Sequence, residues 1–262
     1  MIPANLASCP IEIAGEWPDA PAEAAHAVVT RVREVCLTGI NLWSDDQPNA
    51  LKIENRLSGR PAIWLHDQPA QTAWIKTNVG PRDWCKLAYQ VGHELGHVLC
   101  NSWRLGALPQ PPCQWLEEAL VEAFSVRGLE LLAESWAEHP LFPGDEGFAA
   151  VVRKYKDDIL AKDEELASQH GTTDLRRWFA KKSAELDKET GLGLEQAALP
   201  VVLGLIKPQP TLIADYGALN RWPERSALPL PEYLCCWKDS CKQVGASGTL
   251  PALLGDMLLE AT

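Results

Sequence analysis

The sequence predicts an α+β protein in which a small, mainly antiparallel sheet packs on helices and is followed by a mostly helical C-terminal part. Two observations carry this prediction. Short segments before residue 80 alternate between apolar and polar residues, whereas long segments after it have the period of amphipathic helices. The 262 residues suffice for one large domain or one domain with a helical appendage. We expect residues 1–140 to form the core and residues 141–262 to pack on it and complete a cleft.

The N-terminal part contains one expected helix and three expected strands. The helix covers residues 21–38, whose apolar side chains fall on one stripe. Residues 51–57 alternate as a half-buried strand does, and so do residues 73–79. The apolar run AIWLH, residues 62–66, is typical of a central strand. The helix stripe consists of Ala25, Val28, Val29, Val32, Val35 and Cys36.

Helical periodicity dominates the rest of the chain. A first helix would cover residues 81–101, and a loop rich in proline would separate it from a second helix over residues 113–135. Residues 147–188 have the pattern of two charged amphipathic helices, and an apolar helix follows near 193–206. Residues 208–231 contain five prolines and should be irregular, with short helices after them.

The net charge limits the classes of partner. The chain has 24 Lys and Arg against 35 Asp and Glu, a formal net charge of −11, so we expect neither nucleic acid nor an anionic membrane as partner. The first residues lack the basic and apolar regions of a signal peptide, and the apolar stretch Ala197–Ile206 is too short to span a bilayer. These features favour a cytoplasmic protein, although export without such a signal is compatible with them.

The eight cysteines are too sparse for a disulfide framework, and no CxxC pair occurs. Three of them, Cys235, Cys236 and Cys241, lie close together in the sequence, but their spacing is wrong for a zinc knuckle. We expect buried or partly buried free thiols.

The stretch YQVGHELGHVLCN, residues 89–101, places two histidines on one face of the first long helix. His93 and His97 are four residues apart, which separates them by about 40° on a helical wheel. They lie opposite the apolar stripe, so the helix has one packing face and one imidazole face. The stripe consists of Trp84, Leu87, Ala88, Val91, Leu95 and Val98.

The second long helix repeats this design with carboxylates. In WLEEALVEAFS, residues 115–125, Glu118 and Glu122 lie opposite the apolar residues and about 40° from each other. Paired with the histidines, they are candidate metal ligands. Glu117 lies off this face and is interpreted as an ordinary surface residue.

Together, HELGH and WLEEALVEAFS resemble the gluzincin branch of the zinc metallopeptidases. The resemblance covers residues 89–125 and implies a zincin-like fold with Zn²⁺ bound by His93, His97 and Glu118. It also implies that Glu94 is the general base and that Glu122 fixes the tautomer of His93. Residues 73–79 are then the candidate for the edge strand that lines the cleft in this family. Ala119 departs from the glycine usual at that position.

A second resemblance leaves the third ligand open. Proteases with HExGH that cleave phage repressors have their acidic ligand further downstream, and that match would make Glu122 the ligand. Trp115 and Leu116 set the register that favours Glu118. In either case, two imidazoles and one carboxylate leave a fourth tetrahedral position open, which is typical of catalytic rather than structural zinc. The candidates for stabilising an oxyanion are Tyr155, Tyr216, Tyr233, His139 and His170.

These patterns favour a zinc peptidase that acts on a peptide or protein substrate. One alternative is a zincin-like module that binds metal and a protein partner without catalysis, and the presence of Glu94 weighs against it. The other is a metal-free helical interaction protein, and the matched second helix weighs against that.

Overall fold

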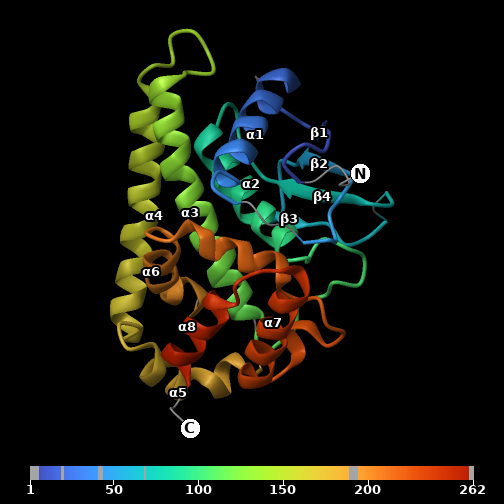
Figure 1. Ribbon diagram of the computed structural model, residues 1–262. Coiled ribbons are helices and arrows are strands. Elements are labelled where there is room, and N and C mark those ends of the chain that lie inside the picture. Colours follow the sequence, from blue (N-terminus) through green and yellow to red (C-terminus); the bar gives the residue numbers. More distant parts are fainter. Residues whose placement is uncertain (1–5, 19–20, 41–43, 68, 189–193, 260–262) are drawn as a thin grey trace.

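A four-stranded sheet forms one side of the molecule, and helices form the rest (Figure 1). The strands are β1 (Ile11–Gly15), β2 (Ala50–Asn55), β3 (Ala62–Ile63) and β4 (Thr72–Thr77), in the spatial order β1-β2-β4-β3. The computed structural model describes all residues except 1–5, 19–20, 41–43, 68, 189–193 and 260–262.

The sheet is mixed, so the expectation of a mainly antiparallel sheet was wrong. Strand β2 pairs in parallel with both β1 and β4, and only the β3–β4 pair is antiparallel. The reason lies in the connections. Helix α1 (Ala22–Cys36) crosses over between β1 and β2 and returns the chain to the same end of the sheet, as a parallel pair requires. Our sequence analysis did not assign β1.

The positions of β3 and β4 in the sheet are the reverse of those predicted. Strand β4 lies inside the sheet rather than at its edge, because β3 pairs along its outer side. Strand β3 is the edge strand and contains only Ala62 and Ile63 of the run that we interpreted as a central strand. The apolar residues of this run pack on the sheet and line the candidate site.

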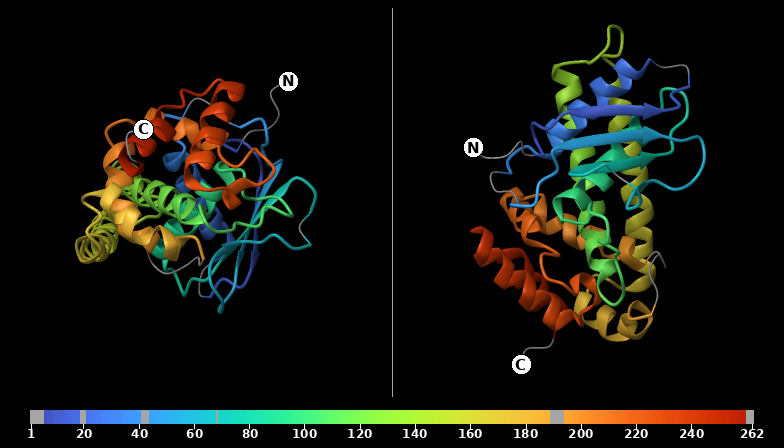
Figure 2. Two further views of the ribbon diagram at one scale, coloured as in Figure 1. Left: turned by 90° about the horizontal axis from the view of Figure 1, so that it is seen from below. Right: turned by 90° about the vertical axis from the view of Figure 1, so that its right-hand side faces the viewer.

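One face of the sheet is covered by α1 and α2 (Trp84–Leu99), while no described helix covers the other face (Figure 2). Every residue of the predicted α1 stripe and the predicted α2 stripe is buried. Helix α2 begins at Trp84 rather than at residue 81, because Asp83 caps it and accepts a hydrogen bond from the Lys86 N–H at 3.3 Å.

Helix α3 (Gln114–Glu138) runs through the centre of the molecule and contacts helices on both sides (Figure 1). It is buried on almost all sides, so residues outside the predicted apolar stripe are buried as well. The helices predicted after it are confirmed. They are α4 (Phe148–His170), α5 (Leu175–Leu186), α6 (Leu194–Ile206), α7 (Leu230–Val244) and α8 (Thr249–Leu258), with 3₁₀ segments η1 (Pro210–Ala218) and η2 (Arg225–Ala227).

Two glycines allow α2 and α3 to approach closely. A Cβ at Gly96 would lie 2.8 Å from the Cβ of Val121, and one at Gly92 would lie 3.1 Å from the Oγ of Ser125. Any larger residue at either position would push the helices apart. This close approach brings the imidazoles of α2 within reach of the carboxylates of α3.

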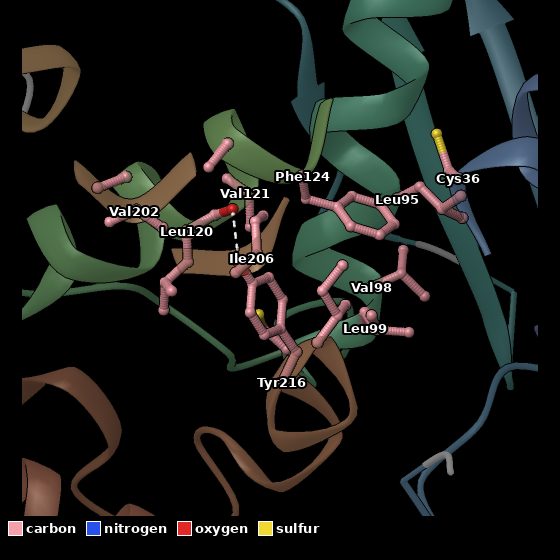
Figure 3. Packing of buried hydrophobic residues seen from close by; sticks show 14 of the residues in the cluster. Cys36, Leu95, Val98, Leu99, Leu120, Val121, Phe124, Val202, Ile206 and Tyr216 are labelled. Atoms are coloured by element: carbon pink, nitrogen blue, oxygen red, sulfur yellow. Dashed lines mark hydrogen bonds between the residues drawn. The ribbon is translucent and has the colours of Figure 1, made fainter. Parts of the chain in front are cut away.

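The core between these helices is apolar and continues into the C-terminal part. Figure 3 shows side chains of α2, α3 and α6 gathered into one cluster, with Tyr216 of η1 beside them. The Tyr216 hydroxyl donates a hydrogen bond to the Leu120 carbonyl at 3.0 Å, so this buried phenol is satisfied. The other labelled members are Cys36, Leu95, Val98, Leu99, Val121, Phe124, Val202 and Ile206.

All eight cysteines are free thiols, as expected. Cys241 is buried, Cys236 is half-buried and Cys235 is exposed. Among the described helices, none is by itself both long and apolar enough to cross a bilayer; the sharply bent pair Gln196–Ile206 and Pro210–Ala218 satisfies the length and composition criteria jointly.

Candidate metal centre

His93, His97 and Glu118 converge to form a group that could hold a metal ion. Their ligand atoms all lie within 4.8 Å of one another. The Glu118 Oε2 atom is 3.3 Å from the His93 Nε2 atom and 3.5 Å from the His97 Nε2 atom. A tetrahedral site with bonds of about 2.1 Å has ligand-to-ligand edges of roughly 3.4 Å, so both distances fit such a site.

His93 is held from its other ring nitrogen by Glu122. The His93 Nδ1 atom lies 2.8 Å from the Glu122 Oε2 atom. This contact lets the imidazole donate from Nδ1, which leaves Nε2 as the free acceptor that faces Glu118. Glu122 therefore contacts the edge of the ring that points away from the ligand group, and Glu118 is the carboxylate that lies with both Nε2 atoms.

His97 has a partner of the same kind that the sequence analysis missed. Its Nδ1 atom lies 2.8 Å from the Glu117 Oε1 atom. Glu117 is 2% exposed, so its interpretation as a surface residue was wrong. The helical wheel placed it off the metal face, but α3 is surrounded by protein, and a residue beside that face can still reach the far side of the second imidazole.

Each of these two carboxylates is bound in turn by another residue. The Asn220 Nδ2 atom donates to the Glu117 Oε2 atom at 2.6 Å, and the Tyr233 hydroxyl donates to the Asn220 Oδ1 atom at 3.1 Å. On the other side, the Tyr89 hydroxyl donates to Glu122 Oε1. We call these sets the Glu117 arm (His97, Glu117, Asn220, Tyr233) and the Glu122 arm (His93, Glu122, Tyr89).

The Glu122 arm also lies near a second buried carboxyl group. Asp163 of α4 is 4% exposed, and its Oδ2 atom has no hydrogen-bond partner within the described part of the chain. Burial and the charge of Glu122 raise the pKa of Asp163 to about 7. The two arms therefore differ in what surrounds them: a neutral amide in one case, and a phenol with a nearby acid in the other.

The electrostatics of the group favour a cation. Burial alone would lower the pKa of His93, but hydrogen bonds to Glu118 and Glu122 outweigh burial and raise that pKa to about 10. Burial would likewise raise the pKa of Glu118, yet the two imidazoles hold it well below its usual range. Carboxylates thus attract positive charge onto the imidazoles. A divalent ion would supply that charge and displace the protons, so its binding should weaken at low pH.

Glu94 lies beside the group without belonging to it. It is 3% exposed, and burial raises the pKa of its carboxyl despite the neighbouring imidazoles. The Ile63 N–H of β3 lies near this carboxyl and acts in the opposite direction on its pKa. The direction of the Ile63 N–H follows from the pairing of β3 with β4. The Trp64 N–H donates to the Trp74 carbonyl of β4 at 2.7 Å, so the N–H of the preceding residue, Ile63, points away from β4, towards α2.

Strand β3 is short, but it is held from the outer face of the sheet. The Lys76 Nζ atom lies 2.7 Å from the ring centroid of Trp64, and the Trp64 and Trp74 rings have centroids 6.4 Å apart. Lys76 is buried, which lowers its pKa to about 8. The apolar run that contains β3 thus packs its tryptophan against the outer face and turns Ile63 to the candidate site.

Two cavities meet at the candidate metal centre. Both are lined by His93, Glu94, Glu118 and Pro61. The Ile63 cavity, of about 200 Å³, adds the apolar residues Ala62, Ile63, Leu65 and Pro109, together with His97, Ser102 and Glu117. The Arg60 cavity, of about 300 Å³, adds residues with polar side chains: Arg60, Tyr89, Gln90, Glu122 and Gln196.

None of the five predicted candidates for oxyanion stabilisation lines either cavity. Tyr216 and Tyr233 use their hydroxyls in the buried hydrogen bonds given above. Tyr155 packs edge-on against Tyr89, with ring centroids 6.2 Å apart.

Comparison of the chain with family models, with curated proteins and with solved structures found no match in any of the three. The likeness to gluzincins thus rests on this chain's own residues.

Proposed function

We propose that this protein is a zinc-dependent, gluzincin-like peptidase that hydrolyses peptide bonds with Glu94 as its general base. One observation carries the proposal: a buried carboxylate, Glu94, lines both cavities together with His93 and Glu118 but does not belong to the candidate ligand group. A site that only holds a metal has no use for such a carboxylate.

The donor set supports zinc. Two imidazole nitrogens and one carboxylate are typical of catalytic zinc sites, and no described thiol takes part in the group. A zinc ion held there would supply Lewis-acid chemistry, which polarises a substrate carbonyl and makes water a stronger acid. Glu117 and Glu122 keep both imidazoles in the tautomer that exposes Nε2.

Glu94 would move the proton. Its carboxylate takes a proton from the attacking water and gives it to the leaving amine, so the proton ends on the product. Glu94 is buried and lines both cavities, so its carboxylate already faces the space where the substrate would lie.

The position of β3 supports an extended peptide as substrate. This edge strand borders the Ile63 cavity, and its outer edge pairs with no other strand of the sheet. An extended peptide can lie along such an edge and form main-chain hydrogen bonds with groups other than the Ile63 N–H, which faces Glu94, and direct a side chain towards the apolar residues of the Ile63 cavity.

The test replaces Glu94 by glutamine, which keeps size and hydrogen bonding but removes the base. Zinc content and melting temperature of Glu94→Gln should match the wild type, while hydrolysis of a peptide library falls by about 10²–10⁴-fold. Glu134→Gln, an exposed change further along α3, is the control and should change neither.

Two outcomes would contradict the proposal. Equal activity of Glu94→Gln and wild type would remove the role of Glu94. A wild type that binds zinc fully but cleaves no peptide would favour a metal-binding module for a protein partner.

A further inference from the structure

The two cavities beside the candidate metal centre differ in charge. Of the residues that line them, Arg60 is the only lysine or arginine, and it lines only the Arg60 cavity. Its side chain is exposed at the mouth of that cavity. A substrate that crosses the centre therefore meets a guanidinium on one side and no lysine or arginine on the other.

The backbone beside Arg60 is tied to helix α2. The Asn78 Nδ2 atom donates to the Gly59 carbonyl at 2.6 Å, and the Asn78 N–H donates to the Gln90 Oε1 atom at 2.9 Å. Gln90 is buried one turn before His93. These two hydrogen bonds fix the backbone next to Arg60 relative to α2, the helix that carries His93 and His97.

The acids in the same cavity already have partners, whereas Arg60 has no ion pair or side-chain hydrogen bond with any residue that the structure describes. Glu122 binds His93 and Tyr89, Glu118 faces both imidazoles, and Glu94 is buried beside them near the Ile63 N–H. Arg60 makes no ion pair within 4.0 Å to any carboxylate that the structure describes. Its guanidinium is left available for an anion that enters from solvent.

We infer that Arg60 is a specificity-determining residue that binds a carboxylate of the substrate on the Glu122 side of the cleaved bond. This inference rests on the proposed function, since it names the substrate class of the same site. Guanidinium binds carboxylate in a planar, two-pronged geometry. The carboxylate belongs either to an Asp or Glu side chain or to the C-terminus of the peptide.

The charge of the whole protein makes this local cation decisive. A net charge of −11 repels acidic peptides at long range, but salt screens that repulsion beyond about 8–10 Å. At contact distance, Arg60 is the only lysine or arginine of the two cavity linings that an acidic group meets. A preference for an acidic group on the Glu122 side should therefore depend on this residue.

The experiment measures peptide binding separately from cleavage. Fluorescent, C-terminally amidated peptides carry Glu, Gln or Lys at one position, moved in turn across the two residues on each side of the cleaved bond. A further pair has a free or an amidated C-terminus. Binding is measured by anisotropy to zinc-loaded Glu94→Gln, and cleavage is measured with the wild type.

At one position we expect Glu peptides to bind roughly three- to tenfold more tightly than Gln peptides, as for a partly exposed charge pair. In Arg60→Gln this preference should disappear, and in Arg60→Glu it should shift to Lys. Arg177→Gln, an equal loss of charge at an exposed position on α5, should keep it. If the free C-terminus rather than Glu shows the preference, the carboxylate is that of the peptide end.

Three results would overturn the inference: equal binding of Glu, Gln and amidated peptides, a preference that survives Arg60→Gln, or no peptide binding at all. Failure of the proposed function looks different. In that case the acidic preference and its loss in Arg60→Gln are seen in binding, while the wild type cleaves no peptide.

Discussion

The two arms of the candidate metal centre each orient one histidine, but they are built from different parts of the chain. In each, a carboxylate of α3 holds the Nδ1 atom of a histidine at 2.8 Å. The Glu122 arm is built within neighbouring helices, and its three residues line the Arg60 cavity. The Glu117 arm is completed by Asn220, which comes from a segment 103 residues further along the chain. The comparison shows that the C-terminal part stabilises the centre through a residue that lies outside both cavities. Of the residues that line the two cavities, only Gln196 comes from that part.

The arms also differ in how well their buried groups are satisfied. Asn220 gives Glu117 a neutral donor and has its own oxygen bound by Tyr233. Glu122 has a phenol as donor but also a buried acid, Asp163, nearby. Like charges in such a place oppose each other. The Glu117 arm should therefore contribute more to folding, while both arms contribute to metal binding.

The largest effects are expected from deleting the two carboxylates. Glu117→Ala and Glu122→Ala should each weaken zinc affinity by about 10–100-fold, because an imidazole loses the partner that sets its tautomer. Only Glu117→Ala should also lower the melting temperature of the metal-free protein markedly, since it leaves the buried Asn220 amide without its closest acceptor. Chelator competition and thermal melting measure the two quantities.

Glu134→Ala on the exposed side of α3 serves as control for both. Unchanged zinc affinity in Glu117→Ala, with a loss in Glu122→Ala, would show that only one arm serves the metal.

A smaller effect is expected at Asn220, which has φ +57 and is therefore replaced by glycine to keep the backbone. Asn220→Gly should weaken zinc affinity less than Glu117→Ala does, and should lower the free energy of unfolding by about 1–3 kcal/mol through lost buried hydrogen bonds.

Asn101→Gly is the matched control. Asn101 has φ +62 and donates to the carbonyls of Gly217 and Leu219, but it does not touch Glu117. Both variants should lose stability, and only Asn220→Gly should lose zinc affinity. Equal zinc affinity in the two would limit Asn220 to a structural role.

The smallest effect on metal binding is expected at Asp163. Its pKa in the folded protein, about 7, lies above its ordinary value of 3.8, so the folded chain binds this proton more tightly than the unfolded chain. Stability from this group is full below about pH 4 and declines as pH rises to about 7. Asp163→Asn should remove that decline and add on the order of 1–3 kcal/mol at pH 8, with little change at pH 4.

Urea unfolding at both pH values measures this, with the exposed Asp256→Asn on α8 as control. A lower stability of Asp163→Asn at pH 8 would mean that the ionised carboxylate is stabilised by a partner.

Sequence patterns anticipated the features that depend on local spacing. The stripes of α1 and α2 and the helices after residue 80 follow from helical periodicity, which also placed His93 and His97 on one face. The choice of Glu118 over Glu122 came from the resemblance to gluzincins, and the structure brings Glu118 together with both histidines. The roles of β3 and β4 did not follow from local patterns, because strand order depends on crossovers that leave no local signal. The sequence did not predict that Glu117 binds His97, because Glu117 is buried and accepts from Asn220, which lies far away in the sequence and reaches α3 only on folding. The only signal in the sequence was that Glu117 is an acidic residue next to Glu118.

Metal content tests the central claim most directly, namely that His93, His97 and Glu118 are the ligands. Purified wild type, His97→Ala, Glu118→Ala and Glu122→Ala would be loaded with zinc, dialysed and analysed for metal per chain. We predict near-stoichiometric zinc in the wild type, almost none in His97→Ala and Glu118→Ala, and an intermediate amount in Glu122→Ala. Equal zinc in the wild type and His97→Ala would contradict the site, and less zinc in Glu122→Ala than in Glu118→Ala would make Glu122 the ligand.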